Sequence, residues 1–250
     1  METTQLTLGG LLVLEPVTAF TDFLITLVSF IGYYKFINKR KKGGLSITYF
    51  AYFFLFMGLG TLFAGLFTHA FSYIFGIDEA EPIKSWIDNL LSNAHNLPNW
   101  LFNIVSVTFF EIATIRMLSK YIKDLNTTFF YIVIAVESLA AFGLILYFFK
   151  YYIAAAHIGF ALYLISMPFQ IINYKTNHSQ YSKFIIIGSL LMIITLPVML
   201  AKLEISKWMN FNDISHLTIM ITMLLFMKAG LNFLQEKPKN KKSHHQNHIE

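Results

Sequence analysis

The sequence contains no cysteine and little charge. Without cysteine, disulfide bonds, iron–sulfur clusters and thiolate metal sites are excluded, so any metal would need histidine, carboxylate or backbone ligands. Only 13% of the 250 residues are charged, whereas 56% are hydrophobic. A water-soluble domain of this size needs far less apolar surface to fill one core. The surplus must face lipid, which predicts an integral membrane protein.

The basic residues also lack the clustering that nucleic-acid binding requires. The 19 lysines and arginines exceed the 14 acidic residues, but they fall mainly in short loops and in the C-terminal tail. We therefore expect no nucleic-acid partner, and we interpret the excess as a signal of membrane topology. The first ten residues lack the basic region and cleavage site of a signal peptide, so the first hydrophobic stretch is expected to remain as a helix.

Seven segments are long and apolar enough to cross a bilayer, which takes about 20 residues for roughly 30 Å of hydrocarbon. Together they predict an all-α membrane bundle of seven helices. A break is expected near Lys150, because one helix through the fourth and fifth segments would be about 68 Å long. The expected spans are Leu11–Ile37, Ser46–Phe75, Pro98–Leu118, Thr128–Phe149, Tyr151–Ile172, Tyr181–Leu200 and Asp213–Gln235.

The positions of the basic residues predict the orientation of the bundle. Fifteen of the 19 fall on one side of the seven spans and four on the other. Because cytoplasmic loops are enriched in lysine and arginine, we expect the N-terminus outside and the C-terminus inside. Residues 1–236 are expected to form the transmembrane domain, and residues 237–250, rich in lysine, asparagine and histidine, a disordered cytoplasmic tail. Abundant Lys, Ile, Asn and Phe suit an AT-rich genome, which points to the inner membrane of a bacterium.

The long outer loop between the second and third spans contains an amphipathic segment. After Pro82, apolar residues from Ile83 to Leu91 recur at the spacing of one helix face. This pattern predicts a short helix that lies in the outer membrane interface rather than crossing it.

Ionisable residues inside a span are costly and mark candidate functional sites when they face the bundle interior. Imidazole and carboxylate ligands together suit zinc, and three protein ligands plus water would form a catalytic site. Asp213 lies three residues before His216, so both can contribute ligands from one turn. Five such residues from four spans are expected within about 10 Å of the outer boundary: Glu15, Asp22, His69, His157 and His216.

Two of these residues also have a structural interpretation. An intramembrane histidine such as His157 can be a hydrogen-bonded contact between helices. Glu15 precedes Pro16 and can be an N-terminal helix residue that the helix dipole favours.

A second polar layer is expected deeper in the membrane, formed by Glu111, Glu137 and Lys228. At least one glutamate should point into the bundle, where it is either a protonated, hydrogen-bonded group or part of a proton path. Lys228 either neutralises a carboxylate or extends to the inner surface.

Four short stretches share the spacing of a known pattern. They read Glu15-x-x-Thr18-x-x-x-Asp22 in the first span, Gly65-x-x-x-His69 in the second, then Asp78, and Asn212-x-x-x-His216 at the start of the seventh. This arrangement resembles the seven-helix membrane hydrolases that group alkaline ceramidases, adiponectin receptors and hemolysin III-like proteins. Those families have serine at the position of Gly65 and a first histidine at the position of Asn212.

The resemblance implies that His69 and His216 bind zinc, that Asp78 orients or deprotonates a water molecule, and that the substrate is a lipid amide or ester. Asp213 or His157 would then replace the missing ligand, while Asp22 is a further candidate for the metal shell or for catalysis. The expected function is a metal-dependent hydrolase that acts on a membrane lipid in the outer half of the bilayer.

The alternative is a non-enzymatic membrane protein, a small transporter or a receptor-like sensor, that uses the same polar pocket for binding. A retinal protein is disfavoured, because Lys228 would lie about 22 Å below the outer boundary, too deep for a central Schiff base.

Overall fold

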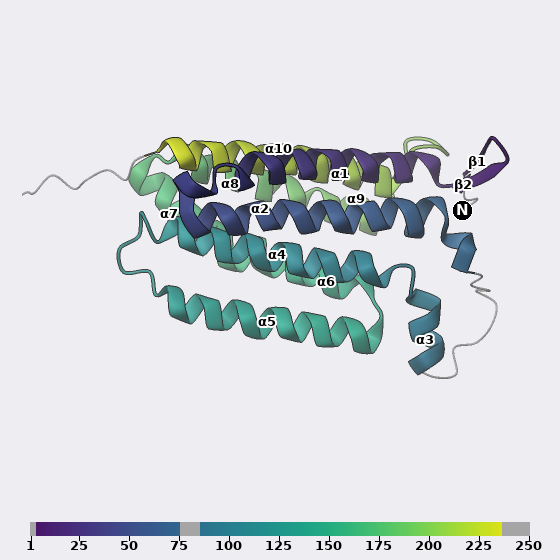
Figure 1. The fold of residues 1–250 in the computed structure, drawn as a ribbon, viewed down its shortest axis with the longest axis horizontal. Helices are drawn as coiled ribbons and strands as arrows, with labels where there is room; N and C mark the ends of the chain where they lie inside the picture. Colours follow the sequence, from purple (N-terminus) through teal and green to yellow (C-terminus); the bar gives the residue numbers. More distant parts are fainter. Residues whose placement is uncertain (1–3, 76–85, 237–250) are drawn as a thin grey trace, which may run out of the picture.

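The computed structural model describes residues 4–75 and 86–236, and in these residues seven helical segments have the length and composition to cross a membrane. The all-α bundle of seven spans predicted from the sequence is therefore confirmed, whereas its orientation stays a prediction. Figure 1 shows the spans running along the long axis of the molecule. The segments are Pro16–Ile37, Arg40–Ala70, Leu97–Leu118, Thr127–Phe148, Tyr151–Asn177, Gln180–Leu200 and Phe211–Gln235.

Four spans are single helices, and three change geometry along their length. The single helices are α1 (Pro16–Ile37), α4 (Leu97–Leu118), α5 (Thr127–Phe148) and α10 (Phe211–Gln235). The second span is α2 (Arg40–Phe63) followed by a π-helical segment, η1 (Ala64–Ala70), and a 3₁₀ turn, η2 (Ser72–Phe75), follows it. The fifth comprises α6 (Tyr151–Gly159), the π-helical η3 (Phe160–Ser166) and α7 (Met167–Asn177), and the sixth comprises α8 (Gln180–Ile193) and α9 (Thr195–Leu200).

The first span begins later than the sequence predicted. Its expected first residues form a strand, β2 (Leu11–Leu14), which pairs antiparallel with β1 (Gln5–Leu8). Gly9 and Gly10 connect the strands with φ angles of 56° and 86°, as a two-residue hairpin turn with positive φ requires. Pro16 then favours a helix start and disfavours helical geometry in the residue before it.

The expected break between the fourth and fifth spans is confirmed. Phe149 has a left-handed backbone with φ 51°, and Lys150 is extended, so α5 ends at Phe148 and α6 begins at Tyr151. Polar side chains cap other helix ends: Asn126 accepts a hydrogen bond from the Phe129 N–H at the start of α5.

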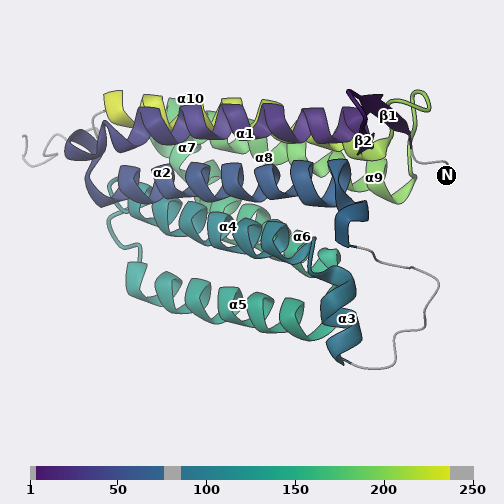
Figure 2. The same ribbon diagram turned by 45° about the vertical axis from the view of Figure 1, so that its right-hand side comes forward.

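A short helix, α3 (Trp86–Asn93), covers part of the segment predicted to lie in the membrane interface. Residues 82–85, where that prediction began, lie outside the described residues. Trp86 donates a hydrogen bond to the Leu146 carbonyl and packs against Phe149, while Ile87 and Leu91 are exposed. Figure 2 shows α3 across the ends of α4 and α5. Its place in the interface stays a prediction.

The helices form a bundle in which α2 packs between α1 and α4, and α10 packs between α1 and α8. The fifth span, led by α6, packs against α4, while α5 contacts α4 and α6 from the periphery, as Figures 1 and 2 both show. The end at which α1 begins is called the α1 end below. It also carries the hairpin, α3 and the start of α10, whereas α10 ends at the opposite end.

The main core is aromatic and joins α1, α2, α4 and α10. The backbones approach closely at small residues: a Cβ atom at Gly230 of α10 would lie 2.6 Å from the Phe50 ring and 2.7 Å from the Phe36 ring. Such small positions let membrane helices pack without a large hydrophobic driving force between them.

At the opposite end, Glu236 joins the end of α10 to the start of α8. Its carboxylate accepts hydrogen bonds from the Tyr181 backbone N–H and from the hydroxyls of Ser179 and Tyr121. Burial, and after it the Glu236 charge, raises the pKa of Tyr121, so this phenol remains a donor at neutral pH. These contacts hold the end of α10 against the start of α8, at the end of the bundle opposite to the α1 end.

Candidate metal centre

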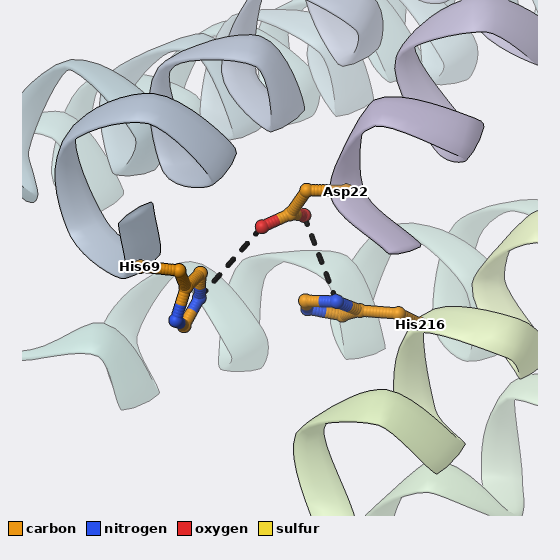
Figure 3. A group of neighbouring side chains, drawn as sticks. All are labelled: Asp22, His69 and His216. Carbon is orange, nitrogen blue, oxygen red and sulfur yellow. Dashed lines mark ion pairs between the residues drawn. The ribbon is translucent and has the colours of Figure 1, made fainter. Parts of the chain in front are cut away.

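Asp22, His69 and His216 come together near the α1 end from three different helical segments. Asp22 lies on α1, His69 on η1 and His216 on α10. Figure 3 shows the two imidazoles pointing toward one another beneath the Asp22 carboxylate. One ligand atom from each residue lies within 4.8 Å of the others, and the two ring centroids are 5.9 Å apart. The spacing brings two nitrogens and one carboxylate to a common point.

The Asp22 carboxylate faces both histidines. Its Oδ2 is 3.7 Å from His69 Nε2, and its Oδ1 is 3.7 Å from His216 Nδ1. Ligands of one zinc ion, at bond lengths of about 2.0–2.1 Å, lie within about 3.5 Å of one another, so ligand atoms within 4.8 Å need only modest side-chain movements to reach one ion. Asp22 is 1% exposed, and its Oδ2 has no hydrogen-bond partner among the described residues. A buried carboxylate in this position calls for a cation, and the residues present therefore fit a zinc ion.

A second carboxylate orients His69. Glu15 Oε2 lies 2.5 Å from His69 Nδ1, which leaves His69 Nε2 facing Asp22. A carboxylate bonded to the far nitrogen of a histidine is the usual support of a metal-binding imidazole, because it selects the tautomer and holds the ring. Glu15 has a left-handed backbone with φ 42°, and its N–H donates to the Thr4 carbonyl. The hairpin and Pro16 thus hold this residue in a conformation that few side chains adopt.

Thr21 supports His216 in the same way. Its hydroxyl donates to the Thr18 carbonyl at 2.9 Å and lies 2.9 Å from His216 Nδ1. A hydroxyl has one hydrogen, so with that hydrogen on Thr18 the imidazole donates from Nδ1 and keeps a lone pair on Nε2. Thr21 was not identified from the sequence, although a hydroxyl next to Asp22 was an available signal.

Local backbone features bring the histidines to the centre. His69 lies in a π-helical segment, a feature that occurs often at functional sites because it changes the direction of side chains. His216 lies in the second turn of α10, whose start is fixed by a capping box between Asn210 and Asp213. A Cβ atom at Gly65 would lie 3.1 Å from the Asp22 Cβ, so glycine, where the resembling families have serine, lets η1 approach α1.

The other described residues predicted for the site, Asp213 and His157, are not members of this three-residue cluster. Asp213 accepts a hydrogen bond from the Asn210 N–H through Oδ2, and it is outside the three-ligand cluster. His157, one of two candidates for the third ligand, instead lies with Glu111 and Glu137. Asp78 lies outside the described residues. Geometry thus favours Asp22 as the third ligand.

In the deeper polar layer, too, the grouping of residues differs from the one predicted from the sequence. Glu111 is buried, in agreement with the expectation that at least one glutamate points inward. Lys228 lies 4.6 Å above the Phe184 ring, and in the described part of the chain it forms no ion pair with either glutamate.

The fold and the site define a multi-span membrane protein with a cluster of two partly buried histidines and one buried carboxylate. Comparison with known families gives a match over residues 17–235 to DUF6962, a family of unknown function, and the chain belongs to that family. No curated protein and no solved structure matches it. The match provides no link to the alkaline ceramidases or their relatives.

Proposed function

We propose that the protein is a metal-dependent membrane hydrolase that cleaves a lipid amide or ester. The observation that carries the proposal is the convergence of Asp22, His69 and His216 from three helical segments, with ligand atoms within 4.8 Å of one another. Three protein ligands that leave a fourth position open are typical of catalytic rather than structural zinc sites. The hydrolase pattern noted in the sequence runs through the same residues.

The depth of the cluster suits a lipid substrate. Asp22 follows Pro16 by six residues, which places it roughly 9 Å below the start of α1. His216 follows the start of α10 by five residues, at a similar depth. The acyl carbonyl of a lipid lies near the boundary between headgroups and hydrocarbon, so its scissile bond can meet the cluster without leaving the membrane.

A zinc ion at this position would polarise a carbonyl oxygen and make water easier to deprotonate. The protein residues supply the remaining parts. Asp22, His69 and His216 would hold the ion, so the base that moves the proton has to be a different group. Glu15 and Thr21 hold the two imidazoles in place. Asp78, the candidate base in the sequence, is proposed to accept a proton from the water as its oxygen bonds to the carbonyl carbon, and to return that proton to the leaving amine or alcohol as the C–N or C–O bond breaks.

The test uses full-length protein purified in detergent with a streptavidin-binding tag, so that no polyhistidine binds metal. Zinc content is measured by mass spectrometry, and fatty-acid release is followed from a ceramide and from a phospholipid. We expect bound zinc and release from one substrate, whereas His216→Ala should hold about one zinc ion fewer per chain and release no fatty acid. The control is His178→Asn, which changes a histidine at the end of α7. His178 has a φ of 53°, which asparagine tolerates, so this variant should keep the zinc content and the activity of wild type.

Equal zinc content in wild type and His216→Ala would overturn the proposal. A second outcome is that His216→Ala loses zinc but the wild-type protein releases no fatty acid from either lipid. This outcome would favour the non-enzymatic alternative, a transporter or sensor that uses the same pocket. The bacterial inner membrane is the proposed location.

A further inference from the structure

A second ionisable cluster lies away from the first, where α4, α5 and α6 meet. Glu111 of α4, Glu137 of α5 and His157 of α6 each offer one ligand atom within 4.8 Å of the others. It shares no residue with the Asp22 cluster. The proposed hydrolase does not use it, and ionisable groups at such depth are too costly to be retained without a role.

His157 is oriented by the backbone of the neighbouring helix. Its ring is buried, and its Nε2 lies 3.2 Å from the Ile104 carbonyl of α4, to which the N–H donates. The other nitrogen, Nδ1, lies 2.7 Å from Glu137 Oε2. A histidine that donates one N–H to a carbonyl presents the second nitrogen in a fixed direction, as metal-binding histidines do.

The two glutamates present oxygens that lack donors. Glu111 is 0% exposed, and apart from the Glu137 carboxyl, with which it can share a proton, its carboxylate has no hydrogen-bond partner within residues 4–75 and 86–236. The Glu137 Oε1 atom is also buried and has no partner in the same residues. Neither glutamate forms an ion pair with lysine or arginine anywhere in the described chain. One oxygen of each glutamate and one oriented nitrogen therefore lie within 4.8 Å of one another, with no lysine or arginine of the described chain paired to either carboxylate.

We propose that Glu111, Glu137 and His157 bind one divalent transition-metal cation at a site separate from the Asp22–His69–His216 centre. Two carboxylates balance the charge of one divalent cation, and a set of oxygen ligands with one imidazole suits zinc or manganese. The contact between His157 and Glu137 opens by less than about 1 Å to reach the ligand spacing of a zinc site. Rotation of the Glu137 carboxylate, which has one unpartnered oxygen, provides this movement.

The site fastens the most peripheral helix to the bundle. Within the described structure α5 packs mainly on α4 and α6, and only 22% of its most apolar stretch is buried. The three ligands come from these same three helices. A cation bound to all three therefore joins α5 to both of its neighbours.

The experiment compares the zinc content of full-length variants after metal removal, reloading with zinc and dialysis. The double variant Glu111→Gln/Glu137→Gln preserves side-chain size and removes both charges. We expect the double variant to lose about one ion per chain relative to wild type, and His216→Ala also to lose about one. The combined variant, which carries all three substitutions, should lose about two. Glu204→Gln, in an exposed loop, is the control and should lose none. The histidines of the tail are present in every variant, so differences between variants decide.

The outcomes separate this inference from the proposed function. If the double glutamate variant keeps as much zinc as wild type, or the combined variant loses no more than His216→Ala, the second site does not exist and the hydrolase centre is unaffected. If only the double variant loses zinc, the second site stands and the hydrolase centre fails. Zinc should also raise the melting temperature of His216→Ala but not of the combined variant, with circular dichroism used to verify that both are folded. An equal rise in both would count against the second site.

Discussion

At the scale of single residues, Glu15 combines an unusual backbone conformation with a direct contact to His69. Its left-handed conformation is unusual for a side chain other than glycine, and it places the carboxylate on His69 Nδ1. Strained backbone of this kind persists where surrounding structure holds it, often at functional sites. The helix-dipole interpretation of Glu15 does not account for this contact, whereas a supporting role for His69 does.

We expect Glu15→Gln to weaken zinc binding by about tenfold or more, because the neutral amide no longer raises the basicity of His69. Competition with a chromogenic chelator measures the affinity. Glu204→Gln is again the matched control and should bind zinc like wild type. Unchanged affinity in Glu15→Gln would show that the short contact with His69 has no part in metal binding.

Gly65 tests how closely η1 must approach Asp22. A methyl group there would lie 3.1 Å from the Asp22 Cβ and 3.3 Å from the Ala19 carbonyl oxygen, so either neighbour must move by a few tenths of an ångström. We expect Gly65→Ala to reduce zinc affinity and to destabilise the fold by about 1–3 kcal/mol, as overpacking does. The control is Gly143→Ala in α5, where no described atom lies within 4 Å of the added methyl. Equal affinities in the two variants would contradict this prediction.

At the scale of elements, the start of α10 determines where His216 lies. The Asn210 side chain accepts from the N–H groups of Asn212 and Asp213, and Asp213 accepts from the Asn210 N–H. The spacing of Asp213 from His216 in the sequence made Asp213 a candidate ligand. Asp213 also lies three residues after Asn210, which is the spacing of a capping box, and this box uses one oxygen of Asp213.

Removing this cap should affect both stability and the site. We expect Asn210→Ala to cost about 1 kcal/mol of stability and to weaken zinc binding, because the first turn of α10 frays one turn before His216. Asn126→Ala removes the corresponding cap of α5, far along the chain from the centre. Thermal unfolding should show similar losses for both, while chelator competition should show weaker binding only for Asn210→Ala. Weaker binding in both variants to the same degree would mean that the effect is one of global stability.

The hairpin and the π-helical segments were the elements that sequence patterns missed. Leu11–Leu14 is apolar enough to continue a membrane span, so hydropathy alone assigned it to the first helix. Two consecutive glycines and Pro16 were the local signals for a turn and a later helix start. A π-helical segment such as η1 has no comparable signature, because the extra residue per turn is accommodated by packing rather than selected by residue type.

For the whole molecule, the orientation in the membrane is a prediction with a direct test. Fifteen of the 19 basic residues belong to the side that we assign to the cytoplasm. A reporter enzyme that works only in the cytoplasm should be active when it is fused after Glu250. A reporter that works only outside the cytoplasm should be active when it is fused before the first span. Periplasmic activity of the C-terminal fusion would reverse the assignment and place the metal centre in the inner half of the bilayer.

The sequence by itself determined that this is a membrane protein, how many spans it has, and which residues can carry chemistry at membrane depth. Those properties depend on length, hydropathy and residue type, which are local to each segment. Depth along a helix is also nearly readable from the chain, which is why Asp22, His69 and His216 were grouped correctly as neighbours in height.

Only the tertiary structure decided which of these residues face one another. Counting residues gives a height but not the direction of a side chain around its helix, nor the order in which helices pack. His157 was therefore assigned to the outer group, whereas packing of α6 against α4 and α5 brings it to Glu137 and Glu111. In the same way the place of Asp22 between two imidazoles follows from the close approach of α1, η1 and α10, a property of the assembled bundle and of no single segment.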